Sequence, residues 1–106
     1  MSGYYLILST VPDEQKGQEI ARELVRERLA ACVTVSPACR SFYWWEEKLT
    51  EDTEYMLYIK TKASLYAKLE AKLKALHPYS VPEIIALPIV KGHEKYLSWL
   101  NTEVKD

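Results

Sequence analysis

A run of four consecutive aromatic residues, Phe42–Trp45, lies in a strand-like part of this chain. Successive side chains of a β-strand point to opposite faces of the sheet, so Phe42 and Trp44 point one way and Tyr43 and Trp45 the other. The strand-like segment Tyr55–Ile59 is also apolar on both faces. A sheet built from these segments therefore carries aromatic and aliphatic surface on both sides.

The first half of the chain predicts a strand, a helix and a long second strand. Tyr4–Thr10 is rich in aromatic and branched residues, and Asp13 follows as the predicted N-cap of a helix. Ala31–Val35 and Arg40–Trp45 predict one long strand that is broken or bulged near Pro37 and lies at a sheet edge, because proline cannot donate to the ladder. Apolar residues at helical spacing form a single stripe on the intervening helix: Ile20, Ala21, Leu24, Val25 and Leu29.

The second half predicts a strand that pairs with the previous one as a hairpin. This strand is expected at Glu54–Thr61, after a charged connection at Glu46–Asp52. Ser64 is the predicted cap of a second helix, which ends before Pro78 because the residue preceding a proline avoids the α region. The leucines of this helix recur at steps of four, four and three, at Leu65, Leu69, Leu73 and Leu76. The remaining predicted elements are a strand at Val81–Val90 and a short helix at Glu94–Val104.

The order βαββαβ followed by a helix predicts an α+β fold, a ferredoxin-like sandwich with two helices on one face of an antiparallel sheet. We expect one domain over residues 1–106. Three or four aromatic side chains on the uncovered face would expose about 500 to 900 Å², whereas a monomer tolerates about 300 to 600 Å². This predicts a homo-oligomer in which sheets pack on sheets. In the alternative, the hairpin folds over its own core and the final helix covers the remaining surface.

Composition limits the partners of the chain. The 14 Lys and Arg nearly balance the 15 Asp and Glu, so no basic surface for nucleic acid or an anionic membrane is expected. The apolar run Tyr4–Leu8 is too short for a signal peptide or a membrane span, which predicts a cytoplasmic protein. In that reducing compartment, Cys32 and Cys39 are expected to be buried free thiols rather than a disulfide or a metal pair.

Five strings, in this order and at this spacing, resemble the CutA family of divalent-cation tolerance proteins: Arg28–Val33, Phe42–Glu46, Ile59–Thr61, His77–Ile84 and Tyr96–Leu100. The resemblance extends from the first strand to the last helix. It implies a ferredoxin-like homotrimer, cytoplasmic in bacteria, that responds to divalent metal ions and binds copper. Trimeric PII signalling proteins have a similar architecture, and the alternative function is therefore a PII-like module that binds a small regulatory ligand.

The resemblance assigns two metal ligands, Glu54 and His77. Where some members of the family carry a cysteine and a second histidine, this chain has Ser9 and Leu76. A copper site would lack those soft and imidazole donors, and copper or another divalent metal is the only cofactor expected. In the alternative, His77 caps the second helix or forms part of the cleft wall, since the helix dipole favours a charged imidazole whereas a metal requires a neutral one.

Further residues define an expected cleft and an expected interface. Lys60 and Thr61 end a strand, and Tyr79 and Glu83 lie where they could converge with them into a polar cleft between subunits; a Lys60–Glu83 ion pair is the alternative. Phe42, Tyr43, Trp44, Trp45 and Trp99 are expected at the interface between copies. Glu47 replaces the glycine usual in the family, which predicts that the hairpin turn has changed type, because a positive φ at Glu47 would cost about 1 to 3 kcal/mol.

The sequence lacks the motifs expected for two other functions of this fold class, catalysis and RNA binding. Ser9–Pro12 lacks the glycine-rich turn and arginine with which a ferredoxin-like acylphosphatase holds phosphate, and Cys32 has apolar neighbours that do not activate a thiol. The third strand lacks the basic and aromatic consensus of RNA-recognition motifs. We therefore expect a protein that is not an enzyme and does not bind nucleic acid.

Overall fold

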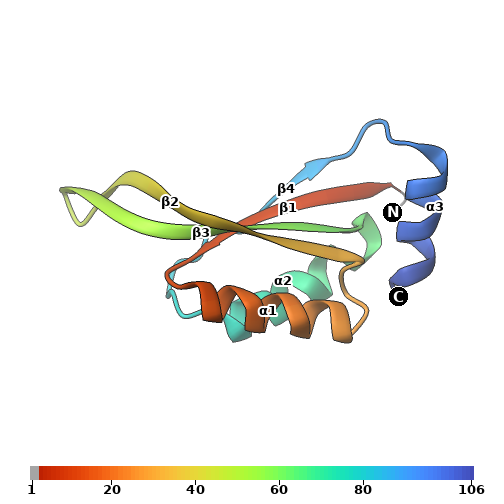
Figure 1. Ribbon diagram of the computed structural model, residues 1–106, viewed down its shortest axis with the longest axis horizontal. Helices are drawn as coiled ribbons and strands as arrows, with labels where there is room; N and C mark the ends of the chain where they lie inside the picture. Colours follow the sequence, from red (N-terminus) through yellow and green to blue (C-terminus); the bar gives the residue numbers. More distant parts are fainter. Residues whose placement is uncertain (1–2) are drawn as a thin grey trace.

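A computed structural model describes residues 3–106, which form a four-stranded antiparallel sheet and three α-helices (Figure 1). The strands lie in the order β2-β3-β1-β4, and the α+β ferredoxin-like architecture predicted from the sequence is confirmed. The elements, in chain order, are β1 Tyr4–Val11, α1 Glu14–Arg26, β2 Cys32–Trp45, β3 Lys48–Lys62, the 3-10 turn η1 Ala63–Leu65, α2 Tyr66–Leu76, β4 Ile85–Pro88 and α3 Glu94–Glu103.

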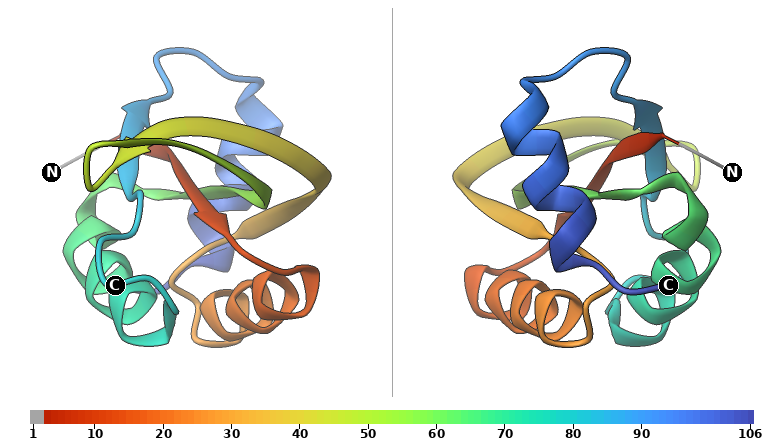
Figure 2. Two further views of the ribbon diagram at one scale, coloured as in Figure 1. Left: turned by 90° about the vertical axis from the view of Figure 1, so that its left-hand side faces the viewer. Right: turned by 90° about the vertical axis from the view of Figure 1, so that its right-hand side faces the viewer.

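Helices α1 and α2 lie side by side on one face of the sheet, and α3 stands at the end of the sheet opposite the hairpin tip (Figures 1 and 2). Ile20 and Leu24 of the predicted α1 stripe and Leu69 and Leu73 of the predicted α2 stripe are buried in the core, whereas Val25, predicted on the α1 stripe, is 40% exposed. Each large apolar side chain buried there stabilises the fold by about 1.5 to 3 kcal/mol. A Cβ on Gly17 would lie 3.2 Å from Val11, which shows how closely α1 approaches the sheet. The core between these layers includes Ile7, Ile20, Leu24, Leu57, Ile59, Leu69 and Leu73.

The two ends of α1 differ in how well the sequence predicts them. Asp13 is the N-cap, and its Oδ1 accepts the Lys16 backbone N–H at 2.7 Å, as predicted. Leu29 was expected on the helical stripe, but the helix ends at Arg26 and Arg28 has a φ of 62°. The Leu29 N–H then bonds the Leu24 carbonyl at 3.1 Å, a Schellman-type ending with arginine at the position where glycine is usual.

Two other predicted boundaries are wrong. Ser64 does not cap α2; its Oγ lies 3.3 Å from Asp106 Oδ2, and a 3-10 turn that buries Ala63 and Leu65 precedes the helix. Burial of Ala63 and Leu65 outweighs the preference of Ser64 for the N-cap position. The fourth strand covers four residues, Ile85–Pro88, rather than Val81–Val90, because prolines near both ends cannot donate to the ladder with β1.

Strands β2 and β3 extend beyond the rest of the sheet as a hairpin, named here the arm, made of residues 39–54 (Figure 1). The last residue of β1, Val11, pairs with Tyr55, so the β3 residues before Tyr55 pair with β2 alone. The predicted charged connection at Glu46–Asp52 is wrong, because the ladder continues to the Trp45–Lys48 pair. The predicted edge position of β2 and its bulge near Pro37 are confirmed, with the register shift between Val35 and Ala38.

The turn at the tip of the arm consists of Glu46 and Glu47, with φ values of 49° and 63°. Two consecutive positive φ angles are typical of a type I′ turn, whose twist matches that of the flanking strands. The predicted change of turn type at Glu47 is therefore wrong. The twist of the long ladder holds both glutamates in a left-handed conformation that asparagine and glycine adopt at lower cost.

Replacing Glu47 by glycine is expected to raise the free energy of unfolding by about 1 kcal/mol, because glycine adopts this φ without strain. Urea unfolding at a fixed protein concentration measures the change. Glu51→Gly is the control; it places glycine in the ladder, opposite Phe42, and is expected to lower stability. An unchanged or lower stability of Glu47→Gly would show that the turn is not strained.

Candidate functional site

The arm has two chemically different faces, because cross-strand partners share a face and successive residues alternate. The outer face carries Phe42, Trp44 and Leu49, which are 64%, 72% and 70% exposed. The inner face carries Tyr43 and Trp45, together with polar residues closer to the body of the sheet. The run of four aromatic residues is thus split two and two, as the alternation predicted.

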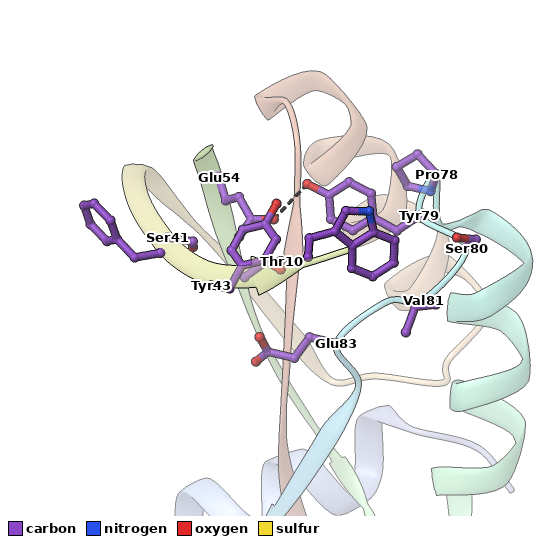
Figure 3. Close-up of a pocket in the computed structure, with 11 residues that line it drawn as sticks. Thr10, Ser41, Tyr43, Glu54, Pro78, Tyr79, Ser80, Val81 and Glu83 are labelled. Atoms are coloured by element: carbon purple, nitrogen blue, oxygen red, sulfur yellow. Dashed lines mark hydrogen bonds between the residues drawn. The ribbon is translucent and has the colours of Figure 1, made fainter. Parts of the chain in front are cut away.

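The inner face of the arm, the end of β1 and the segment between α2 and β4 surround a cavity of about 670 Å³ (Figure 3). Its lining combines aromatic rings with two carboxylates and three small hydroxyl side chains, and it includes no lysine or arginine. The lining residues are Thr10, Ser41, Phe42, Tyr43, Trp45, Glu54, Pro78, Tyr79, Ser80, Val81 and Glu83.

A chain of hydrogen bonds connects β1, the loop after α2 and β3 at the back of this cavity. His77 Nε2 donates to the Thr10 carbonyl oxygen at 2.9 Å, and His77 Nδ1 accepts the Tyr79 backbone N–H at 3.1 Å. The Tyr79 hydroxyl donates to Glu54 Oε2 at 2.7 Å (Figure 3). Since one imidazole nitrogen donates and the other accepts, the ring is neutral, with its proton on Nε2.

The surroundings of His77 favour this neutral form. Burial lowers the pKa of His77 below its usual value, and the Thr10 carbonyl and the Glu54 carboxylate oppose this only in part. Both ring nitrogens are already engaged, so within one chain the imidazole has no free lone pair for a metal ion. His77 occupies the C-cap position of α2, as the alternative expected, but its ring bonds β1 and Tyr79 rather than the carbonyls at the end of the helix.

Glu54 is the buried charge of the site. It is 6% exposed, and among the described residues only Tyr79 bonds its carboxylate, through Oε2. On the opposite strand, the Cys39 thiol lies 3.1 Å from the Glu54 backbone carbonyl and donates to it. Both Cys32 and Cys39 are free and half-buried, so the thiols are less deeply buried than the sequence predicted.

The phenols of the cavity are bound to carboxylates. Tyr43 donates to Asp52, and this hydrogen bond raises the pKa of Tyr43 to about 12. Burial, and then the hydrogen bond to Glu54, raises the pKa of Tyr79 as well. Both hydroxyl protons therefore stay on the tyrosines and point at carboxylate oxygens, so these groups are unable to donate to a ligand.

The predicted metal ligands Glu54 and His77 come together around Tyr79. Nevertheless, residues 3–106 contain no group of three His, Cys, Asp or Glu side chains placed to hold a metal ion. Ser9 lies in the core on the helix-facing side of β1, where its Oγ is buried without a hydrogen-bond partner in the described chain. Leu76 packs against the same core. Neither Ser9 nor Leu76 lines the cavity, so their identity does not change its chemistry.

The residues expected in one cleft are separated within one chain. Tyr79 and Glu83 line the cavity, whereas Thr61 is buried and donates to the Leu29 carbonyl at 2.6 Å. The Lys60 ammonium lies 3.2 Å from the Tyr96 hydroxyl and 5.5 Å from the centre of its ring, and the described residues form no Lys60–Glu83 ion pair. Trp99 lies on α3, at the end of the molecule opposite the arm (Figure 1). Its ring packs on Tyr96, and the side chain is 43% exposed.

Several residues of the site, unlike Ser41, have no signal in the sequence that places them there. Ser41 follows from the same alternation that places Tyr43 and Trp45 on the inner face. Cys39 and Asp52 were missed because their role depends on the register of the hairpin, in which Cys39 pairs with Glu54. Thr10, Ser80 and Val81 belong to segments distant in sequence, and no local pattern brings them to the arm.

The neutral state of His77 generates a prediction about pH. A lowered pKa in the folded state means that the unfolded chain binds more protons, so stability falls as the pH drops below the unfolded value of about 6.5. We expect the melting temperature of the wild type to decrease more steeply between about pH 7.5 and pH 5 than that of His77→Asn. His93→Asn is the matched control at the exposed histidine and should keep the wild-type slope. Equal slopes for the wild type and His77→Asn would contradict the assignment.

Comparison with known proteins places this geometry in a family. The CutA1 divalent ion tolerance protein family matches residues 5–103. The divalent-cation tolerance protein CutA of Thermus thermophilus is 50% identical over 96 residues, which cover 91% of this chain and 93% of the relative. The crystal structure of CutA from Xylella fastidiosa superposes with a TM-score of 0.95 at 46% identity, covering 98% of this chain and 100% of that one.

The cytoplasmic location predicted from the sequence is overturned by related proteins. A solved structure from Archaeoglobus fulgidus, 34% identical with a TM-score of 0.93 over 96% of this chain and 99% of that one, is described as a periplasmic divalent cation tolerance protein. A rice relative, 45% identical over 95% of this chain, is described as chloroplastic, and this chain spans 57% of its length. Proteins that share this fold thus differ in their described location, and the sequence of the fold does not determine the compartment.

None of the helices in residues 3–106 is long and apolar enough to cross a membrane. The family match over residues 5–103 and the superposition over nearly the whole chain agree with each other. On these grounds, the chain belongs to the CutA1 family of divalent ion tolerance proteins.

Proposed function

We propose that this protein provides tolerance to divalent cations as a homotrimer that binds copper or another divalent metal ion and performs no catalysis. The observation that carries the proposal is Glu54, a carboxylate 6% exposed at the wall of a cavity whose lining includes no lysine or arginine. A buried carboxylate without a cationic neighbour favours a bound cation, because the charge is poorly solvated there.

The proposed metal ligands are Glu54 and, after release of its protein hydrogen bonds, His77. One chain supplies too few donors for a closed site, so the remaining ligands would come from water or from a second copy. Cys39 adds a soft donor on the strand facing Glu54, which suits copper better than the serine hydroxyl considered from the sequence. In this proposal, Tyr79 orients Glu54 through the hydrogen bond to Oε2.

Trimer formation is proposed from the outer face of the arm. Phe42, Trp44 and Leu49 are exposed there, on a two-stranded ladder that has no third strand to support it. Isolated hairpins are marginally stable in water, so contact with another copy would stabilise the arm as well as cover its apolar side chains. The number of three copies comes from the resemblance to the family.

A PII-like ligand carrying phosphate groups is not supported by the cavity. Charge-assisted binding of phosphate uses arginine or lysine, whereas the side chains that line this cavity are neutral or acidic. For the same reason we propose no organic phosphate cofactor. The proposed partners are other copies of the chain and metal ions.

Substitution of the buried carboxylate tests the metal site. Glu54→Gln keeps an acceptor for Tyr79 but removes the charge, and it is expected to weaken copper binding about tenfold, with Cys39→Ser weakening it further. Metal analysis after equilibrium dialysis against Cu²⁺ or Zn²⁺ measures the amount bound. Glu51→Gln, an exposed carboxylate on the outer face of the arm, is the control and should bind as the wild type does. Equal copper binding by Glu54→Gln and the wild type would refute this site.

Substitution on the outer face of the arm tests the assembly. The wild type is expected to scatter light as a particle of three times the 12.3 kDa of one chain, and Trp44→Glu as a smaller particle, since a charge there would be buried without a partner. Val25→Glu, a substitution of an exposed apolar residue on α1, is the control and should leave the mass unchanged. A wild-type mass equal to one chain would overturn the proposed trimer.

A further inference from the structure

The cavity under the arm is negatively charged. Two carboxylates, Glu54 and Glu83, contribute to its lining, and Asp52 lies behind Tyr43 as its hydrogen-bond partner. The nearby imidazole of His77 is neutral, and no lysine or arginine lines the walls. The charges in and beside this space therefore favour a positively charged occupant.

The hydrogen-bonding groups of the cavity also favour a cation. The two phenolic protons are used on Glu54 and Asp52, so a ligand meets the faces of the tyrosine rings and the remaining carboxylate lone pairs. In particular, no described residue bonds Glu54 Oε1, although this side chain is 6% exposed and stands at the wall of the cavity (Figure 3). An anion would find only neutral side-chain donors there, namely the hydroxyls of Thr10, Ser41 and Ser80 and the indole N–H of Trp45.

The size and the apolar part of the lining indicate an organic cation rather than a bare ion. A volume of about 670 Å³ is within the range of sites for small organic molecules, about 300 to 1,000 Å³. A metal ion needs several ligands at about 2.0 to 2.6 Å, and it leaves most of such a space unfilled. The rings of Tyr43, Trp45 and Tyr79 offer the faces on which substituted ammonium groups bind.

We propose that this cavity is a binding site for a small alkylammonium ion, with its charged nitrogen between Glu54 and Glu83 and its alkyl groups against the aromatic rings. The buried carboxylate supplies the charge attraction, and the rings supply a surface that excludes water. This site goes beyond the proposed metal binding and does not depend on it, because the recognition uses ring faces and charge rather than coordination. It also assigns a role to the inner face of the arm that differs from the contact proposed for the outer face.

The first test compares a charged ligand with its neutral analogue. Choline carries a trimethylammonium group, and 3,3-dimethylbutanol has the same shape with a carbon in place of the nitrogen. Calorimetric titration of the full chain with each compound, in the presence of EDTA, is expected to show saturable binding of choline and at least about tenfold weaker binding of the alcohol. Butylammonium tests whether N–H donors to Glu54 strengthen the binding. Equal binding of choline and the alcohol, or no binding of either ammonium ion, would overturn the proposal.

Matched variants locate the binding site. Glu83→Gln and Trp45→Leu are each expected to weaken binding of the tighter ammonium probe about tenfold, because they remove one charge or one ring from the lining. Glu51→Gln on the outer face and Trp99→Leu on α3 are the controls for charge and for ring removal, and both should bind as the wild type does. Far-ultraviolet circular dichroism confirms that each variant is folded. If the controls lose as much affinity as the cavity variants, the ammonium ion binds elsewhere and the assignment is wrong.

The test separates this proposal from the metal proposal. EDTA removes divalent ions during the titrations, so a failure of copper binding leaves the choline result unaffected. Conversely, Glu83 and Trp45 are not among the proposed metal ligands. Loss of ammonium binding in Glu83→Gln and Trp45→Leu with unchanged copper binding would therefore support an ammonium site that is separate from the metal site.

Discussion

The difference in length between the β2–β3 ladder and its neighbour β1 shapes the functional part of this molecule. Val11 is the last residue of β1 to pair with β3, and beyond Tyr55 the hairpin continues without a third strand. Neither α1 nor α2 extends under the arm, so neither helix covers either of its faces (Figure 1). One face exposes Phe42 and Trp44, and the other forms the roof of a cavity.

The hydrogen bonds through His77 connect this arm to the body of the protein. They join the Thr10 carbonyl of β1, the loop after α2 and the Glu54 carboxylate of β3. A neutral imidazole satisfies its neighbours as donor and acceptor at once, which a charged ring or a metal-bound ring would not. The buried carboxylate is thus held in position by the protein itself, while one of its oxygens stays available for a cation. A chain with a formal net charge of only −1 thus carries a locally acidic cavity.

The sequence predicted the fold well because periodicity reports which face of each element is buried. The stripes of α1 and α2, the Asp13 cap and the bulge near Pro37 follow from local chemistry and are present in the structure. The errors lie where longer-range forces compete with that chemistry. Burial of Ala63 and Leu65 replaced the Ser64 cap, and the pairing of polar residues across the arm extended a ladder where charge suggested a loop.

The candidate site was only partly accessible from sequence. The resemblance to CutA proteins pointed to Glu54 and His77, the expected cleft included Tyr79, and alternation predicted the two faces of the aromatic run. Only the tertiary structure showed that Lys60 and Thr61 are separated from Tyr79 and Glu83 within one chain, that both nitrogens of His77 are occupied, and that Cys39 and Ser41 lie beside Glu54 and the cavity. The sequence by itself determined the elements and their buried faces, because these depend on neighbours three or four residues away. The cavity was decided by hairpin register and by docking of the loop after α2, which are contacts between distant segments that no local pattern encodes.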